Sequence, residues 1–282
     1  MLTEEETDKR KRETVKNKLY CSTGTMVGRA NGWNHRLFIE NGKYIEADGF
    51  ELMMVKAYYE KLDTVLRDAV NSGLCFGVIH AEKDIGYYLG GDETDRAEAI
   101  RLFRINCEAG KAVGAEKLVL HLWSGPRSDN DLSKNLLMLD SLYAIADEYG
   151  IRLLIENVPC ALHDPLTNLK SVLEQKPKAQ FVYDIRFGAF HEQNDKILSS
   201  GALSDGRIDH IHISDYVGPP HDFASLRPIL HLGKGIIGTD TLLPKIVKEY
   251  HGTLTLESPE ILESGCAVDA INQDLVYIKK YL

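Results

Sequence analysis

Four side chains of the types that bind divalent metals or transfer protons each follow a short apolar run typical of a β-strand. They are Glu156 in RLLIENV, Asp184 in QFVYDIR, His212 in IDHIHIS and Glu257 in TLTLESP. Carboxylate oxygens and imidazole nitrogens together suit a divalent cation. Each residue taken alone is equally compatible with a structural carboxylate or a hydrogen-bonded core histidine. Their recurrence at four strand ends favours one shared metal site.

Three further histidines accompany this set. His80 ends the apolar run FGVIHAE and His121 lies in KLVLHLW, so both are candidates for metal or substrate contacts, with a hydrogen-bonded core histidine as the alternative. His210 precedes His212 by two residues, and in a strand both side chains point the same way. Because His212 is nearer the strand end, we assign it as the ligand and His210 as a supporting or packing residue.

Two features indicate binding of an anionic group. The glycine-rich segment LHLGKGIIG, residues 230–238, precedes a predicted helix. Backbone amides in such a turn can bind phosphate, and Lys234 would add positive charge, although plain turn chemistry explains the glycines equally well. Arg186 follows Asp184 by two residues and is a second candidate for holding an anion near the predicted metal.

The elements that must position these residues alternate along the chain. Apolar runs predict strands at 19–26, 50–55, 76–82, 117–123, 152–158, 180–186, 208–214 and 253–259, and helical patterns predict helices at 60–73, 93–114, 131–150, 165–176, 239–252 and 269–282. Sustained alternation predicts an α/β fold with a parallel sheet, and this length suits a closed (β/α)8 TIM barrel of one domain. An open doubly wound sheet is the alternative, which the missing G-x-G-x-x-G turn disfavours.

A closed barrel would unite the candidate residues, because the C-terminal ends of its strands meet at one mouth. We place the barrel at residues 18–282 and a charged tail or helix at 1–17. That opening segment has no apolar stretch of a signal peptide, and no run of 18 apolar residues occurs in the chain. The five cysteines include no C-x-x-C pair, which favours free thiols and a cytoplasmic location. The net charge of −9 disfavours nucleic acid as a partner.

The ordered motifs LLIENVP, VYDIR, HIHISD, LGKGIIG and TLESPE resemble the xylose isomerase-like barrel superfamily. This group includes sugar phosphate isomerases and epimerases, tagatose-type 3-epimerases and the endonuclease IV family. The resemblance spans residues 18–282 and is best between 117 and 258. It matches Glu156 to the glutamate of the I-E-N strand, Asp184 to the aspartate of the next strand, His212 to the second histidine of the H-x-H strand and Glu257 to the final-strand glutamate.

In the epimerase relatives, the resemblance implies that these four residues hold one divalent ion, commonly manganese, with magnesium, cobalt or zinc as alternatives. The two glutamates then act as an acid/base pair on opposite faces of the reacting carbon. The implied activity is isomerisation or epimerisation of a small sugar, sugar phosphate or polyol-like ketone through an enediolate. We expect His80, His121, Arg186 and Lys234 to contact that substrate. We expect no nucleic-acid or membrane partner. A homo-oligomer is an open alternative to a monomer.

The chain departs from the epimerase pattern at three substrate-contacting positions. Phe187 replaces the histidine of a D-x-x-H motif, Leu162 replaces an acid six residues after the first glutamate, and Gly218 replaces an arginine six residues after the metal histidine. These changes predict that the substrate is not a free ketohexose.

Two other functions stay open. His80 and His121 match histidines of endonuclease IV, which needs three zinc ions, but Phe187 removes one ligand and only His231 stands near the place of a missing D-x-H pair. A non-catalytic barrel that keeps the metal as a structural element is the other alternative.

Overall fold

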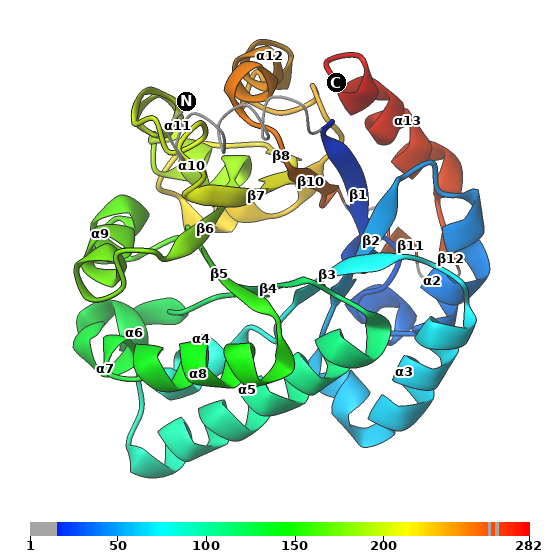
Figure 1. Cartoon of the computed structure of the whole chain (residues 1–282). Coiled ribbons are helices and arrows are strands. Elements are labelled where there is room, and N and C mark those ends of the chain that lie inside the picture. Colours follow the sequence, from blue (N-terminus) through cyan, green and yellow to red (C-terminus); the bar gives the residue numbers. More distant parts are fainter. Residues whose placement is uncertain (1–15, 259–260, 263–264) are drawn as a thin grey trace, which may run out of the picture.

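The computed structural model describes residues 16–258, 261–262 and 265–282, with a closed barrel of eight parallel strands at its centre (Figure 1). The strand order around the barrel is β1-β10-β7-β6-β5-β4-β3-β2. This architecture confirms the predicted (β/α)8 barrel and excludes the open doubly wound sheet. The barrel strands are β1 (Lys18–Ser22), β2 (Gly49–Met53), β3 (Phe76–His80), β4 (Lys117–Leu120), β5 (Arg152–Glu156), β6 (Gln180–Asp184), β7 (Ile208–Ile213) and β10 (Thr253–Leu256).

Helices follow the strands and surround the barrel (Figure 1). The α-helices are α2 (Arg36–Asn41), α3 (Leu62–Asn71), α4 (Asp84–Leu89), α5 (Glu93–Val113), α6 (Gly125–Asn130), α7 (Ser133–Leu136), α8 (Leu139–Tyr149), α9 (Pro165–Gln175), α10 (Ile185–Phe190), α11 (Asn194–Ser199), α12 (Thr239–Glu249) and α13 (Val268–Lys279). Short 3-10 helices are η1 (Thr23–Thr25), η2 (Arg29–Asn31), η3 (Gly42–Tyr44), η4 (Lys56–Lys61) and η5 (Phe223–Leu226), and two small sheets pair β8 (Asp215–Tyr216) with β9 (Ile229–Leu230) and β11 (Ile261–Leu262) with β12 (Gly265–Cys266).

Local signals in the sequence explain where the long helices begin and end. Asp92 caps α5 by accepting from the backbone N–H of Asp95, whose side chain accepts from the Asp92 N–H in return. Gly114 ends this helix in the left-handed conformation that glycine adopts without strain, and Gly150 ends α8 in the same way. These boundaries agree with the predicted helices.

The helix predicted over 131–150 is instead two helices, α7 and α8. The Asn135 side chain donates to the carbonyl oxygens of Leu122 (2.7 Å) and Gly86 (3.0 Å). These long-range bonds anchor α7 to the segment after β4 and to α4. The helical pattern of the sequence carries no information about these tertiary contacts, so it predicted one continuous helix.

The barrel interior changes from apolar to polar along the strands. Tyr20, Val78, Val119, Leu154 and Val182 form one buried apolar cluster. Because side chains alternate along a strand, the inward residue two positions after Leu154 is Glu156, and the one after Val182 is Asp184. The apolar layer therefore lies under a polar layer at the C-terminal ends of the strands.

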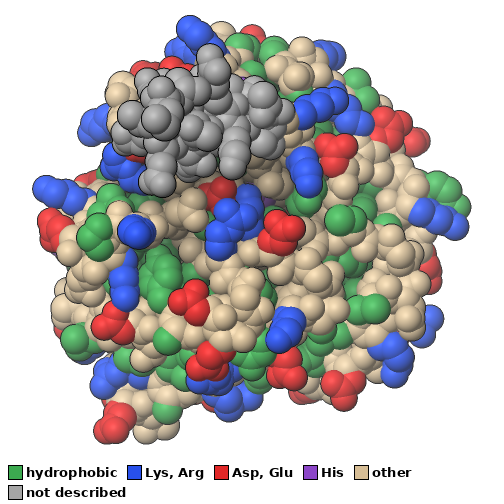
Figure 2. Space-filling view, viewed as in Figure 1, with side chains coloured by type: hydrophobic (Ala, Val, Ile, Leu, Met, Phe, Trp, Pro, Cys, Tyr) green, Lys and Arg blue, Asp and Glu red, His purple; other side chains and the backbone are tan. Residues whose placement is uncertain are grey.

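The face shown in Figure 2 carries acidic and basic side chains interspersed with one another. Within the described part of the chain, no helix is long and apolar enough to cross a membrane. The first barrel strand begins at Lys18, and residues 1–15 of the predicted tail lie outside the described residues.

Candidate metal centre and active site

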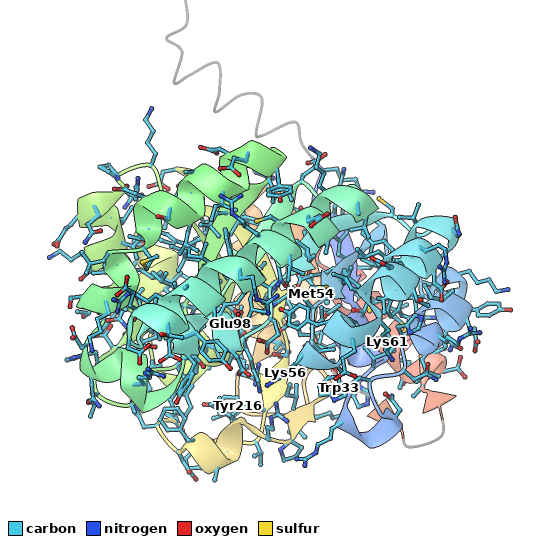
Figure 3. All side chains as sticks on the ribbon, turned by 90° about the horizontal axis from the view of Figure 1, so that it is seen from below. Trp33, Met54, Lys56, Lys61, Glu98 and Tyr216 are labelled. Carbon is cyan, nitrogen blue, oxygen red and sulfur yellow. The ribbon has the colours of Figure 1, made fainter. Side chains whose placement is uncertain are left out.

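The mouth of the barrel is the end of the molecule to which the C-terminal ends of the strands point. In Figure 3, Trp33, Lys56 and Tyr216 lie toward this end, and each belongs to a segment that follows a barrel strand. The predicted ligands come from the last residue of β5, the last residue of β6, the body of β7 and the first residue after β10. The topology thus collects them in one layer just inside the mouth.

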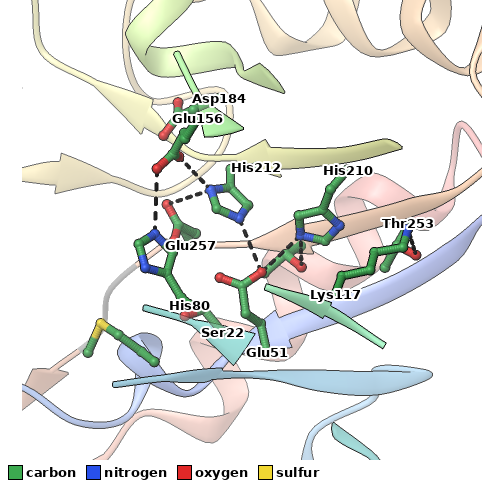
Figure 4. Close-up of polar contacts among 12 residues, drawn as sticks. Ser22, Glu51, His80, Lys117, Glu156, Asp184, His210, His212, Thr253 and Glu257 are labelled. Atoms are coloured by element: carbon green, nitrogen blue, oxygen red, sulfur yellow. Dashed lines mark hydrogen bonds and ion pairs between the residues drawn. The ribbon is translucent and has the colours of Figure 1, made fainter. Parts of the chain in front are cut away.

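The structure brings all four predicted ligands together (Figure 4). Glu156, Asp184, His212 and Glu257 each offer one ligand atom, and these atoms lie within 4.8 Å of one another. His212 Nδ1 is 2.7 Å from Glu156 Oε1 and 3.7 Å from Glu257 Oε2. Glu156, Asp184 and His212 are buried and Glu257 is partly exposed. Three carboxylates and one imidazole at this spacing have the chemistry of a divalent metal site.

Backbone contacts hold the two strand-end carboxylates in place. Asp184 Oδ1 accepts from the backbone N–H groups of Arg186 (2.7 Å) and Phe187 (3.0 Å), so this residue also caps α10. Asn157 donates to the Asp184 carbonyl oxygen (3.1 Å) and accepts from its N–H (2.7 Å). This pair ties the end of β5 to the end of β6 and fixes the orientation of the neighbouring Glu156.

Two buried carboxylate oxygens fit a cation. Glu156 Oε2 and Asp184 Oδ2 are buried, and neither accepts a hydrogen bond of regular geometry from the described residues, although Glu156 Oε2 lies within ion-pair distance of two histidine rings. A buried carboxylate oxygen is costly when it is not compensated. Both residues belong to the four-residue group, so a divalent ion bound there would compensate these buried oxygens.

His80 and His121 converge on the same carboxylate. Their Nε2 atoms lie 3.5 Å and 2.6 Å from Glu156 Oε2, and their ring centroids are 4.9 Å apart. Together with Glu156 they form one of two further groups with ligand atoms close enough to share a metal, and the other group comprises Glu51, His80, His212 and Glu257. The structure therefore places both histidines at the mouth, beside the four-residue group.

The electrostatics of the cluster reflect its burial and dense charge. Burial raises the pKa of Asp184 to about 7, with Arg186 opposing and Glu156 and Glu257 adding to the rise. Burial lowers the pKa of His80, but the contact with Glu156 outweighs it and raises the value to about 9. Burial also acts against ionisation of Glu156, yet His212 and His121 hold its pKa well below the ordinary range. A cation among these carboxylates would further favour their ionised forms.

Glu51, which lies inside β2 and is fully buried, was not among the residues predicted for the site. Its Oε2 lies 2.9 Å from His210 Nε2 and 3.1 Å from His212 Nε2 (Figure 4). The sequence does contain a signal for Glu51, because it is an acidic residue inside the otherwise apolar run FELMMV. Side chains alternate along a strand, so every second residue of this run points into the barrel, and Glu51 is on that side. His210, predicted as a supporting residue, contacts Glu51 and Thr255.

Arg186 lies beside Asp184 with a nearly buried guanidinium group. Its Nε donates to Ser214 Oγ (3.1 Å) and its Nη1 to the Leu226 carbonyl (3.3 Å), and its Nη2 is 3.6 Å from Asp184 Oδ2. The guanidinium carbon stands 4.5 Å from the ring centroid of Phe187. The arginine is thus held at the edge of the four-residue group.

The glycine-rich segment binds a carboxylate of this chain rather than presenting its amides to a phosphate. The N–H groups of Gly233, Gly235 and Ile237 all donate to Asp215, at 3.1, 2.9 and 3.3 Å. These amides are therefore not available to an external phosphate, which corrects the anion-binding interpretation of the loop backbone. Lys234 is exposed on the same loop.

The residues that replace the epimerase substrate contacts have other environments. Leu162 is 60% exposed. Gly218 has a φ of +69°, and a Cβ atom there would overlap the Ile236 side chain, so the loop accepts only glycine without rearrangement. Two other histidines contact protein groups. His191 Nε2 accepts from the Cys160 N–H (3.1 Å), and His231, which stands near the place of the missing D-x-H pair, has its Nδ1 2.8 Å from Asp274 on α13.

A family model described as "Xylose isomerase-like TIM barrel" matches residues 40–279. No curated protein matches the chain. Among solved structures, a D-allulose 3-epimerase from Methylomonas sp. is 16% identical, with a TM-score of 0.69 over 95% of this chain and 99% of the other.

Two further solved structures show the same fold. The IOLI protein with a bound zinc atom is 18% identical, with a TM-score of 0.70 over 94% of this chain and 99% of the other. The 3-keto-D-glucoside 4-epimerase YcjR from E. coli is 17% identical, with a TM-score of 0.65 over 94% of this chain and 100% of the other.

Proposed function

Since this chain belongs to the xylose isomerase-like TIM barrel family, we propose that it is a divalent-metal-dependent isomerase or epimerase of a small sugar, sugar phosphate or polyol-like ketone. The observation that carries the proposal is the convergence of Glu156, Asp184, His212 and Glu257, with ligand atoms within 4.8 Å of one another. Similarity of fold to sugar epimerases and to a zinc-binding relative supports the same class.

In this proposal the four residues hold one metal ion. Manganese is the expected ion, with magnesium, cobalt or zinc as alternatives that this mixed oxygen and nitrogen ligand set also accepts. When bound, the ion would polarise the substrate carbonyl and stabilise negative charge on its oxygen. The unbonded oxygens of Glu156 and Asp184 support this assignment.

Glu156 and Glu257 are the proposed proton-transfer pair. They extend from β5 and from the end of β10, two strands separated in the barrel by β6 and β7. A substrate carbon held between them would present a different face to each carboxylate. One carboxylate removes the proton beside the carbonyl, which leaves an enediolate, and the other returns a proton to the opposite face. One carbon–hydrogen bond breaks and one forms, so the reaction needs no oxidant or reductant.

Four residues are the proposed substrate contacts. His80 and His121 face Glu156 from neighbouring strands and could donate hydrogen bonds to substrate hydroxyl groups. Arg186 and the exposed Lys234 are the proposed partners of an anionic group. The replacement of the epimerase contacts by Phe187, Leu162 and Gly218 supports a substrate other than a free ketohexose.

An endonuclease-like phosphodiesterase is the second candidate. The additional group of His80, His121 and Glu156 favours it, because that group is suited to a second metal. The commitment of His231 to Asp274 and the presence of Phe187 weigh against a complete three-metal cluster. A barrel that keeps the metal without catalysis is a third candidate, which turnover on a broad substrate panel would eliminate.

The metal assignment is tested by elemental analysis of the purified protein and of Glu257→Gln. The wild-type protein should carry one divalent ion per chain, and the variant should lose most of it, because a neutral amide is a poor replacement for a carboxylate ligand. Full occupancy in the variant would contradict the assignment.

The reaction is tested by NMR detection of deuterium incorporation from deuterated water across keto-sugars, inososes and their phosphates. We expect metal-dependent exchange of one carbon-bound proton beside a carbonyl, and its loss in both Glu156→Gln and Glu257→Gln. Metal content is measured for each variant, because a weaker metal site would also lower exchange. Variants that retain metal and exchange at the wild-type rate would show that these carboxylates do not transfer the proton.

A further inference from the structure

Glu51 is a fully buried carboxylate of a barrel strand that the proposed reaction does not use. It lies in β2, whereas its partners His210 and His212 lie in β7, and β1 and β10 separate these strands on one side of the barrel. The side chain therefore reaches across the interior to meet both imidazoles through one oxygen, at 2.9 Å and 3.1 Å.

The two nitrogens of His212 have different surroundings. Nδ1 faces the carboxylates of the predicted metal site, 2.7 Å from Glu156 Oε1, whereas Nε2 faces Glu51 Oε2 at 3.1 Å. An imidazole binds a metal through the nitrogen that carries no proton, and the other nitrogen then donates its N–H. The contacts on this ring therefore assign Nδ1 to the metal and the proton to Nε2.

We propose that Glu51 is a positioning residue that holds His212 with its Nδ1 toward the metal by accepting a hydrogen bond from the Nε2–H group. This inference rests on the proposed function, because it presumes a metal at the four-residue group. An ionised carboxylate can accept hydrogen bonds but cannot donate one, so Glu51 favours the tautomer with the proton on Nε2 and leaves Nδ1 free to bind the metal. The position of Glu51 in a barrel strand, rather than in a loop, makes this orientation rigid.

His210 supports the arrangement from the side away from the mouth. Its Nε2 is shared between Glu51 Oε2 and Thr255 Oγ1, at 2.9 Å and 3.0 Å. This contact restrains the Glu51 oxygen that His212 uses. Thr255 touches His210 but is not the partner of His212, which makes Thr255→Val a matched control within the same buried layer.

The test compares zinc binding by calorimetry in the wild-type protein, Glu51→Gln, Glu51→Asp and Thr255→Val. We expect Glu51→Gln to weaken zinc binding by roughly 10–100-fold, the usual effect of removing the partner of a metal-ligating histidine. Glu51→Asp should recover part of the affinity because it keeps a carboxylate, and Thr255→Val should bind zinc as the wild-type protein does. Wild-type affinity in Glu51→Gln, even with lower thermal stability, would overturn the proposal and leave Glu51 a structural residue.

Histidine-labelled 15N NMR of the zinc-loaded wild-type protein provides a second readout that does not depend on any variant folding. His212, assigned by its replacement, should bind zinc through Nδ1 and show a slowly exchanging Nε2 proton. Zinc on Nε2 would overturn the proposal and indicate direct binding near Glu51. If the wild-type protein binds zinc but Glu51 has no effect, only this inference fails, whereas absence of zinc binding in the wild-type protein would remove the proposed metal site as well.

Discussion

At the scale of single residues, the barrel interior contains polar groups that the fold must compensate. Some of these groups are compensated by contacts with other polar side chains; one oxygen of Glu51, for example, contacts two histidines. Glu156 and Asp184 each retain a buried oxygen without a hydrogen bond. Such oxygens are a cost to folding that a bound cation would recover. Two of the four residues assigned to the metal are thus among the buried polar groups that the protein alone does not fully compensate.

Glu82, in the segment after β3, is another buried carboxyl group whose ionisation is costly. The proposed reaction does not use this residue. Burial, with help from Asp84, raises the pKa of Glu82 to about 7 from an ordinary value of 4.5. The native state therefore binds more protons than the unfolded chain in this interval, and stability is lost as the pH rises from about 4.5 through about 7.

We predict that Glu82→Gln is more stable than the wild-type protein at pH 8, by up to about 3 kcal/mol, and gains little at pH 4.5. The glutamine oxygen can keep the bond that Oε2 accepts from the Asp84 N–H (3.1 Å). Urea unfolding at a series of pH values measures the difference, and Glu93→Gln at an exposed position controls for loss of a surface charge. A stability difference that does not change with pH would contradict the assigned ionisation.

At the scale of elements, the site depends on how closely helices approach the strand ends. Gly86 lies in α4 directly against the chain that follows β4, and a Cβ atom there would overlap the His121 carbonyl oxygen and lie 3.0 Å from the carbonyl carbon of Trp123. The Gly86 carbonyl also accepts from Ser128 Oγ (2.9 Å). The absence of a side chain at this position therefore lets α4 support the segment that carries His121.

We predict that Gly86→Ala lowers the melting temperature by roughly 2–10 °C and shifts the His121 imidazole resonances. Alanine favours a helix over glycine by roughly 0.5–1 kcal/mol. The overlap involves backbone atoms, which cannot rotate away, and overpacking costs about 1–3 kcal/mol. Thermal unfolding and histidine NMR make the comparison, with Lys83→Ala at the exposed start of α4 as control. An unchanged or higher melting temperature would show that α4 can move away at little cost.

At the scale of the whole molecule, the net charge limits which partners the protein can bind strongly. The chain has a net charge of −9. Strong binding of duplex DNA depends on neutralising phosphates with clustered basic residues. Within the family fold, this charge favours a small-molecule substrate over DNA.

We predict that a duplex with an abasic site stays intact when it is incubated at low salt with the zinc-loaded protein. Gel electrophoresis detects single-strand cleavage, and His121→Ala distinguishes cleavage by this site from that of a contaminant. Efficient cleavage that disappears in the variant would favour the endonuclease-like function over the isomerase.

The sequence by itself determined the barrel and its strands, and it indicated four candidate metal ligands that the structure brings together, because these depend on local patterns. Each apolar run identifies a strand, and a polar residue at its end must lie at the mouth once the sheet is parallel and closed. The prediction of one helix over 131–150 was wrong because that region depends on tertiary contacts. The Asn135 side chain bonds to Gly86 and Leu122, and no local pattern shows these contacts.

Only the tertiary structure decided which partners the polar groups have. Glu51 and His212 are 161 residues apart in the chain, and Asp215 takes the loop amides that glycine content alone assigned to phosphate. A residue type and its spacing limit what a side chain can do locally. The contact that it makes across a barrel depends on register and on which wall it faces, and these arise only when the sheet closes.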